Sequence, residues 1–253
     1  MHGCRIGLFV GVALGGVGLA AVSSATDLRG TLGGADALNV TPVQMPPRYR
    51  AAYWEVPNGV LNLTTARPSV EFDLGVVLTG PGIAESAQPV PLRIEGGRCR
   101  PGTVVISPGT TLDITNADLI GHELYAVARG GNDRVVPAEV TSPRARRQVQ
   151  LRAAGVYELR DVRQPSFRCW VIAGPGQGRL LLPNATGAFA ATGLNDGDYT
   201  VKVYFEGAER ASQAVQIRGR EAQVQISLGG GGAAGGAAPP AGGDDDHHGH
   251  HGR

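Results

Sequence analysis

The sequence predicts an all-β protein made of two consecutive sandwiches. After residue 68, short runs rich in β-branched residues recur between Gly, Pro, Asn and Asp, while patterns of helical period are nearly absent. "TLDIT" (111–115) places Leu112 and Ile114 on one face, and "RQVQLR" (147–152) does the same with Val149 and Leu151, as half-buried antiparallel strands require. From residue 178, strand pairs are joined by turns rich in Asn, Asp and Gly, which indicates a second, smaller sandwich.

The first residues are typical of a secretory signal peptide. Arg5 precedes an apolar run that ends at the small residues 23–25. The alternative is a membrane anchor, but the run is rich in Gly and a small-residue cleavage pattern follows it. We therefore expect residues 1–25 to be removed on export and the mature protein to be periplasmic or secreted, with no membrane span in what remains.

The remaining chain divides by composition. Residues 26–68 show clustered aromatics but no clear period, so we expect an irregular segment packed on the first sandwich, with Tyr53 and Trp54 as anchors. The first sandwich is expected over residues 69–174 and the second over 175–228. The Gly/Ala/Pro tract that opens residues 229–253 cannot bury enough apolar surface to fold, so a disordered tail is expected.

Charge and cysteine content narrow the function classes. The net charge is +1, with 23 basic and 22 acidic residues, which argues against a dedicated nucleic-acid binder. Loss of Cys4 with the signal leaves Cys99 and Cys169, and an even pair in an oxidising compartment predicts one disulfide. Two buried free thiols are the alternative.

The second sandwich resembles a known module in its order of turns and strands. "NATGAFAATGL" (184–194) and "NDGDYTVKVY" (195–204) are similar to the carboxypeptidase regulatory-like module, a small Ig-like β-sandwich. Tyr199, Val201 and Val203 are expected to point into its sheet. Such modules are usually non-catalytic, so the resemblance implies a fold rather than an activity.

The first sandwich resembles the Greek-key, cupredoxin-like domains of exported proteins related to methylamine-utilisation cupredoxins. The resemblance covers residues 89–174 and is carried by "GTVVISPGTTLDITN" (102–116), the corner Asn116-Ala117-Asp118 and His122. It implies that His122 stands where the family places its first copper-ligating histidine. The family's cysteine, second histidine and frequent methionine would follow on one loop, but Asp161, Val162, Arg163 and Gln164 occupy those positions here.

A count of ligand-type residues argues against an intact copper centre. A type 1 site needs two imidazoles and a thiolate, usually with an axial methionine. His122 is the one histidine in the predicted folded region, and the one methionine besides Met1 is Met45. We therefore expect His122 to be a hydrogen-bonded structural residue close to "RDVRQPSF", with Asp161 or Gln164 nearby. The alternative is that His122 contacts a ligand, titrates or binds a metal. For the whole protein, a copper electron carrier is the third and least favoured function.

The tail "DDDHHGHHGR" is the densest cluster of metal-ligand residues. Imidazoles and carboxylates suit divalent copper, zinc or nickel. The candidate ligands are His247, His248, His250 and His251. A solubilising or purification-derived tail is the alternative.

The sequence leads to a binding or structural function rather than an enzymatic one. The predicted folded region contains no Gly-x-Ser-x-Gly elbow and no nucleotide-binding loop, so no catalytic residue and no cofactor of the core are expected. We predict an exported, non-enzymatic protein of the cell envelope on a copper-less cupredoxin-like fold, with an envelope or extracellular protein or glycan as its partner. Metal handling through the tail is the main alternative, and the sequence does not predict an oligomeric state.

Overall fold

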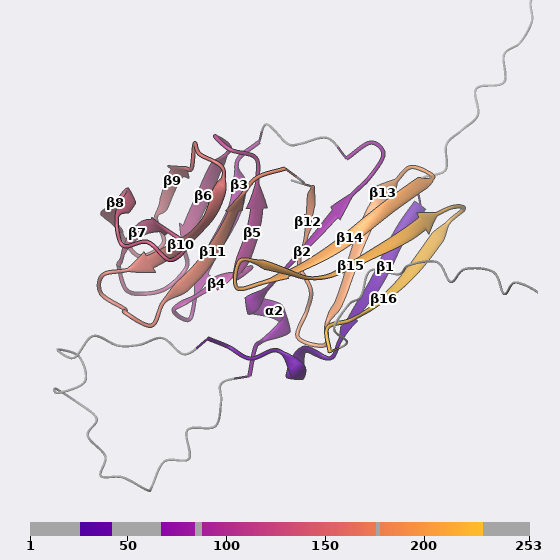
Figure 1. The fold of residues 1–253 in the computed structure, drawn as a ribbon, viewed down its shortest axis with the longest axis horizontal. Helices are drawn as coiled ribbons and strands as arrows, with labels where there is room; N and C mark the ends of the chain where they lie inside the picture. Colours follow the sequence, from indigo (N-terminus) through magenta and orange to yellow (C-terminus); the bar gives the residue numbers. More distant parts are fainter. Residues whose placement is uncertain (1–25, 42–66, 84–87, 176–177, 230–253) are drawn as a thin grey trace, which may run out of the picture.

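The computed structural model describes residues 26–41, 67–83, 88–175 and 178–229, and it shows two β-sandwiches lying side by side (Figure 1). The predicted all-β class is confirmed. Two short helical turns complete the described parts of the chain: the 3-10 helix η1 (Ala35–Ala37) and the helix α2 (Val70–Asp73). Within the described residues, no helix is long and apolar enough to cross a membrane.

The first sandwich is built from one continuous stretch of chain. Its five-stranded sheet has the order β5 (Thr103–Ile106), β11 (Arg168–Ala173), β10 (Gly155–Asp161), β7 (His122–Ala128) and β8 (Arg134–Thr141). Its four-stranded sheet has the order β4 (Arg98–Arg100), β3 (Val90–Glu95), β6 (Thr111–Asn116) and β9 (Arg146–Gln150). Leu112, Ile114, Val149 and Leu151 are buried between the sheets, as the alternation of "TLDIT" and "RQVQLR" predicted.

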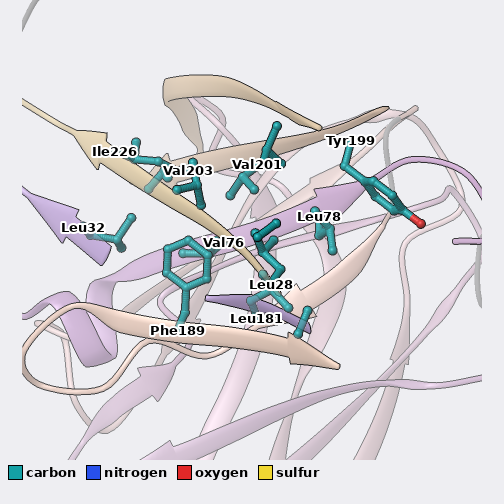
Figure 2. Close-up of a cluster of buried hydrophobic side chains, with 14 of the residues drawn as sticks. Leu28, Leu32, Val76, Leu78, Leu181, Phe189, Tyr199, Val201, Val203 and Ile226 are labelled. Carbon is teal, nitrogen blue, oxygen red and sulfur yellow. The ribbon is translucent and has the colours of Figure 1, made fainter. Parts of the chain in front are cut away.

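The second sandwich draws strands from both ends of the described chain. One sheet has the order β13 (Ala188–Leu194), β1 (Thr26–Gly33) and β16 (Glu221–Ser227). The other has the order β12 (Arg179–Leu181), β2 (Leu74–Thr79), β14 (Gly197–Phe205) and β15 (Ala208–Ile217). Tyr199, Val201 and Val203 belong to this core as expected, and Figure 2 shows them in one cluster with Leu28 and Phe189.

Two early segments lie elsewhere than the sequence predicted. Residues 26–33 were expected to be irregular and packed on the first sandwich, but they form β1, which pairs with β13 and β16 of the second. Its alternation places Leu28 and Leu32 in the core of that sandwich. β2 was assigned to the first sandwich by the expected boundary at residue 69, but it pairs with β12 and β14. The first sandwich is thus inserted in sequence between strands of the second.

The continuous apolar run of β2 explains the second error. Leu74, Val76 and Leu78 face the core of the second sandwich. Val77 points the other way and packs with Val105 of β5 and Tyr204 of β14 in the contact between the two sandwiches. A strand buried on both faces shows no alternation, so its sequence gives no sign of the sheet to which it belongs. Tyr53 and Trp54, the predicted signal peptide and the tail from residue 230 lie outside the described residues.

Candidate functional site

The predicted site residue His122 lies at one end of the first sandwich, between two carboxylates. It is the first residue of β7, and its side chain is fully buried. Its Nδ1 is 2.6 Å from Oδ2 of Asp161, the last residue of β10, and its Nε2 is 3.1 Å from Oδ2 of Asp118. The expected proximity of His122 to Asp161 is confirmed. Gln164, the other expected neighbour, lies beside Gly97.

The loop that carries Asp118 is held by the buried side chain of Asn116. Its Oδ1 accepts a hydrogen bond from the Asp118 amide at 2.9 Å, an Asx-type turn. Its Nδ2 donates to the carbonyl oxygens of Ile120, Thr141 and Ser142 at 2.8, 3.1 and 3.1 Å. Because this one amide joins the loop to the end of β8, it fixes the position of Asp118 relative to His122.

Two glycines bring backbone donors to Asp118. Gly96 and Gly97 form the two-residue turn between β3 and β4, and both have positive φ (62° and 69°), the region that favours glycine. Their amides donate to Oδ1 and Oδ2 of Asp118 at 2.6 and 2.8 Å. Burial acts to raise the pKa of Asp118, but these two hydrogen bonds, together with the hydrogen bond and charge of His122, outweigh it and lower the pKa below the usual value. Asp118 is therefore an anion that supports the imidazole.

Asp161 is the more deeply buried of the two carboxylates. Its side chain is 1% exposed, against 14% for Asp118. Its Oδ1 accepts hydrogen bonds from the amides of Glu123 at 3.1 Å and Arg163 at 2.8 Å, while Oδ2 faces His122. Both ring nitrogens of His122, the atoms that could ligate a metal, are therefore within hydrogen-bond distance of a carboxylate oxygen.

The predicted disulfide is confirmed and removes the thiolate that a copper centre would need. Cys99 of β4 and Cys169 of β11 are joined across the two sheets, with a Cα–Cα distance of 5.8 Å. His122 is the one histidine in the described part of the chain, and no group of three or more His, Cys, Asp or Glu side chains there is arranged to hold a metal ion. The residues in the described part of the chain therefore do not fit a type 1 copper site.

Other predicted ligands cannot be placed. Met45 and the tail histidines His247, His248, His250 and His251 lie outside the described residues, so the metal-binding tail stays a prediction. Sequence reasoning also missed a cluster of charged side chains, Glu158, Arg160 and Arg168, on the outer face of the five-stranded sheet. In "YELRD" and "FRCW", charged residues alternate with apolar ones, which indicates a strand with one outward face. This pattern does not reveal that the three charged side chains lie together in space.

Comparisons with known proteins find partial structural similarity. Searches of family models and of curated proteins find no match. Among solved structures, the chain is similar to a purple cupredoxin from Nitrosopumilus maritimus (19% identity, 34% of this chain and 99% of that chain, TM-score 0.31) and to amicyanin from Paracoccus versutus (22%, 39% and 97%, TM-score 0.31). It is also similar to a Cu-containing nitrite reductase from Thermus scotoductus (17%, 39% and 25%, TM-score 0.31).

Structural similarity with identities of 17–22% and TM-scores of 0.31 does not assign a function to the chain. The resemblance of the second sandwich to the carboxypeptidase regulatory-like module is not addressed by these comparisons and stays a prediction.

Proposed function

We propose that the chain is an exported, non-enzymatic binding or structural protein of the cell envelope, whose first sandwich is a cupredoxin-like fold without copper ligands. The observation that carries this proposal is the bracketing of His122 by Asp118 and Asp161 at 3.1 and 2.6 Å. At His122, where the sequence resemblance to cupredoxin-like domains would place the first copper-ligating histidine, this chain has a buried network of hydrogen bonds. A network of this kind holds loops in place rather than exchanging electrons.

Two further observations support the export and the lack of catalysis. A disulfide that closes a long loop is typical of oxidising compartments, which fits a periplasmic or secreted protein. Nucleophilic or general base catalysis by histidine needs a ring nitrogen within reach of a substrate. His122 has no exposed surface, and carboxylates occupy both of its nitrogens.

Copper titration of a chain that lacks residues 229–253 tests this proposal. Copper(II) should produce no intense visible thiolate-to-copper charge-transfer band, because the two sulfurs are bonded to each other and His122 is occupied. Full-length protein serves as the control for weak colour caused by the tail. A blue truncated protein would overturn the proposal, since it would require a free Cys169 thiolate next to His122 and a second imidazole.

A second candidate function is metal handling through the tail, favoured by the sequence "DDDHHGHHGR". This cluster of imidazoles and carboxylates should bind zinc or nickel with at best micromolar affinity, about 8 kcal/mol. Calorimetry of the full-length and truncated chains separates the two candidates. Binding that disappears on truncation supports the tail, whereas tight binding that persists would place a metal site in the folded part and make His122 a ligand.

A further inference from the structure

A cleft of about 740 Å³ lies where the two sandwiches meet, and its size is within the range of small-molecule sites. Arg160 of β10 and Arg168 and Trp170 of β11 line it from the outer face of the five-stranded sheet. Phe205 and Glu206, at the end of β14, line it from the second sandwich. The cleft therefore combines a charged sheet face with a wall from the other unit.

Two arginines in the cleft share one carboxylate oxygen. Nη2 and Nε of Arg160 lie 2.6 and 2.8 Å from Oε2 of Glu158, and Nε of Arg168 lies 3.6 Å from the same oxygen. Arg160 and Arg168 are directly opposite each other in the β10–β11 ladder. The two guanidinium groups repel each other in this arrangement, and the single carboxylate of Glu158 neutralises the charge of one of them.

The cluster of Arg160, Arg168 and Glu158 is partly buried, which raises the free-energy cost of its uncompensated positive charge. The side chains of Arg160, Arg168 and Glu158 are 22%, 25% and 10% exposed. Burial lowers the pKa of Arg168 below its usual value, and the positive charge of Arg160 lowers it further. Nη1 of Arg168 donates to the carbonyl oxygens of Pro165 and Phe167 at 2.8 and 2.7 Å, so its guanidinium is already oriented.

The lining of the cleft carries a surplus of one positive charge. Four guanidinium groups line it, from Arg67, Arg98, Arg160 and Arg168, against the three carboxylates of Asp73, Glu158 and Glu206. Asp73 accepts hydrogen bonds from Arg98 and from the Ser69 amide, and Glu206 accepts two from Thr41. A single carboxylate on a ligand would neutralise the surplus, and the planar guanidinium matches carboxylate geometry. A polyphosphate or nucleic acid would bring more negative charge than the lining can offset.

We propose that this cleft binds a carboxylate-bearing saccharide of the uronic acid class, with its carboxylate at Arg160 and Arg168. Asn132 and Ser166 also line the cleft and supply the mixed donors and acceptors that sugar hydroxyls require. The inference rests on the proposed function, because it names a ligand class for a binding protein. It does not involve the His122 network, so the copper titration tests the proposed function separately.

Calorimetry of the full chain with an acidic trisaccharide that carries one galacturonate residue, and with uncharged galactotriose, tests this inference. The acidic trisaccharide should bind and galactotriose should not, because the single surplus positive charge selects the ligand with one carboxylate. Arg160→Gln should weaken binding about 10-fold or more, as expected for the loss of a charged hydrogen bond. Arg29→Gln is the matched control: it removes the same charge from β1, where Arg29 is 69% exposed, and should leave binding unchanged.

Two more variants keep the test decisive if Arg160→Gln fails to fold. Arg160→Lys keeps the charge but loses the planar fork, so it should also weaken binding. Glu158→Gln removes the internal competitor for both arginines and should tighten binding several-fold. No binding of the acidic trisaccharide would overturn the inference, and so would equal binding of galactotriose. Equal weakening by Arg29→Gln and Arg160→Gln, or weaker binding by a folded Glu158→Gln variant, would also overturn it. If the copper titration gives no colour in that case, the inference fails while the proposed function stands.

Discussion

The two sandwiches bury different kinds of side chain. The core of the second is apolar, and Thr26 is its one buried polar residue among those described. The first buries a set of polar and charged residues, mostly at its His122 end and on its outer face. They are Thr103, Asn116, His122, Thr141, Arg147, Glu158 and Asp161. It also contains the disulfide. Apolar burial is non-directional and only requires that the strands meet, whereas buried polar groups must each find a partner.

This difference indicates what each sandwich is built to do. In the second, strands from distant parts of the chain are joined by hydrophobic burial and strand pairing, as in β1 with β16. In the first, hydrogen bonds fix the detailed positions of loops, as Asn116 does for the loop 117–121. We therefore expect the first to be sensitive to the removal of individual polar or covalent links and the second to be sensitive to changes in volume. Four predictions test this comparison.

The largest effect is expected from opening the disulfide. Cys99→Ser and Cys169→Ser should each lower the free energy of unfolding by about 4 kcal/mol, because either change opens the same loop, whose ends are 70 residues apart. Urea denaturation of both variants measures this. Thiol titration of the denatured native protein should find no free cysteine in the mature chain. Two reactive thiols, or very different costs for the two variants, would contradict this account.

His122→Ala should lower the free energy of unfolding by about 3 kcal/mol, because it leaves Oδ2 of the buried Asp161 carboxylate without its partner. Arg93→Ala is the control, since it breaks an exposed ion pair with Glu95 and should cost less than about 1 kcal/mol. Chemical denaturation at neutral pH compares the two. Equal costs would mean that the buried network contributes no more than a surface pair.

Gly30→Ala tests the apolar sandwich through volume alone. A Cβ at Gly30 would overlap the ring of Phe189, so overpacking should cost about 2 kcal/mol. Gly33→Ala in the same strand is the matched control, because nothing lies within 4 Å of the added Cβ there. Thermal unfolding should show a lower Tm for Gly30→Ala than for Gly33→Ala. Similar Tm values would show that this core can rearrange around a methyl group.

The smallest effect concerns acid stability. Because the folded protein lowers the pKa of Asp118, this residue contributes stability above the unfolded pKa, which is lost as pH falls through the folded value. Asp118→Asn should therefore be less stable than the native chain at pH 7, and this difference should shrink below about pH 4. Asp36→Asn, at an exposed position, is the control. Urea denaturation at pH 7 and pH 3 measures both, and a deficit that grows in acid would contradict the sign of the shift.

Part of the candidate site was predictable from residue counts and spacing. The two cysteines outside the predicted signal peptide can pair in one way, and the single histidine of the predicted folded region cannot supply two imidazoles. The proximity of His122 to Asp161 followed from the resemblance to cupredoxin-like domains. That Asp118 is the second partner could not be predicted, because its position depends on hydrogen bonds from Gly96 and Gly97 in a turn that is distant in sequence.

The sequence by itself determined the all-β class, the positions of the alternating strands and the pair of cysteines available for a disulfide. Each of these properties follows from the local sequence or from a residue count. Alternation shows that a strand has one buried face, and the numbers of histidines and cysteines limit the possible metal ligands. Only the tertiary structure decided that β1 and β2 belong to the second sandwich and that Arg160 and Arg168 share Glu158 in a cleft. A strand's backbone groups pair equally well with many partners, so its place in a sheet is set by how the whole core packs.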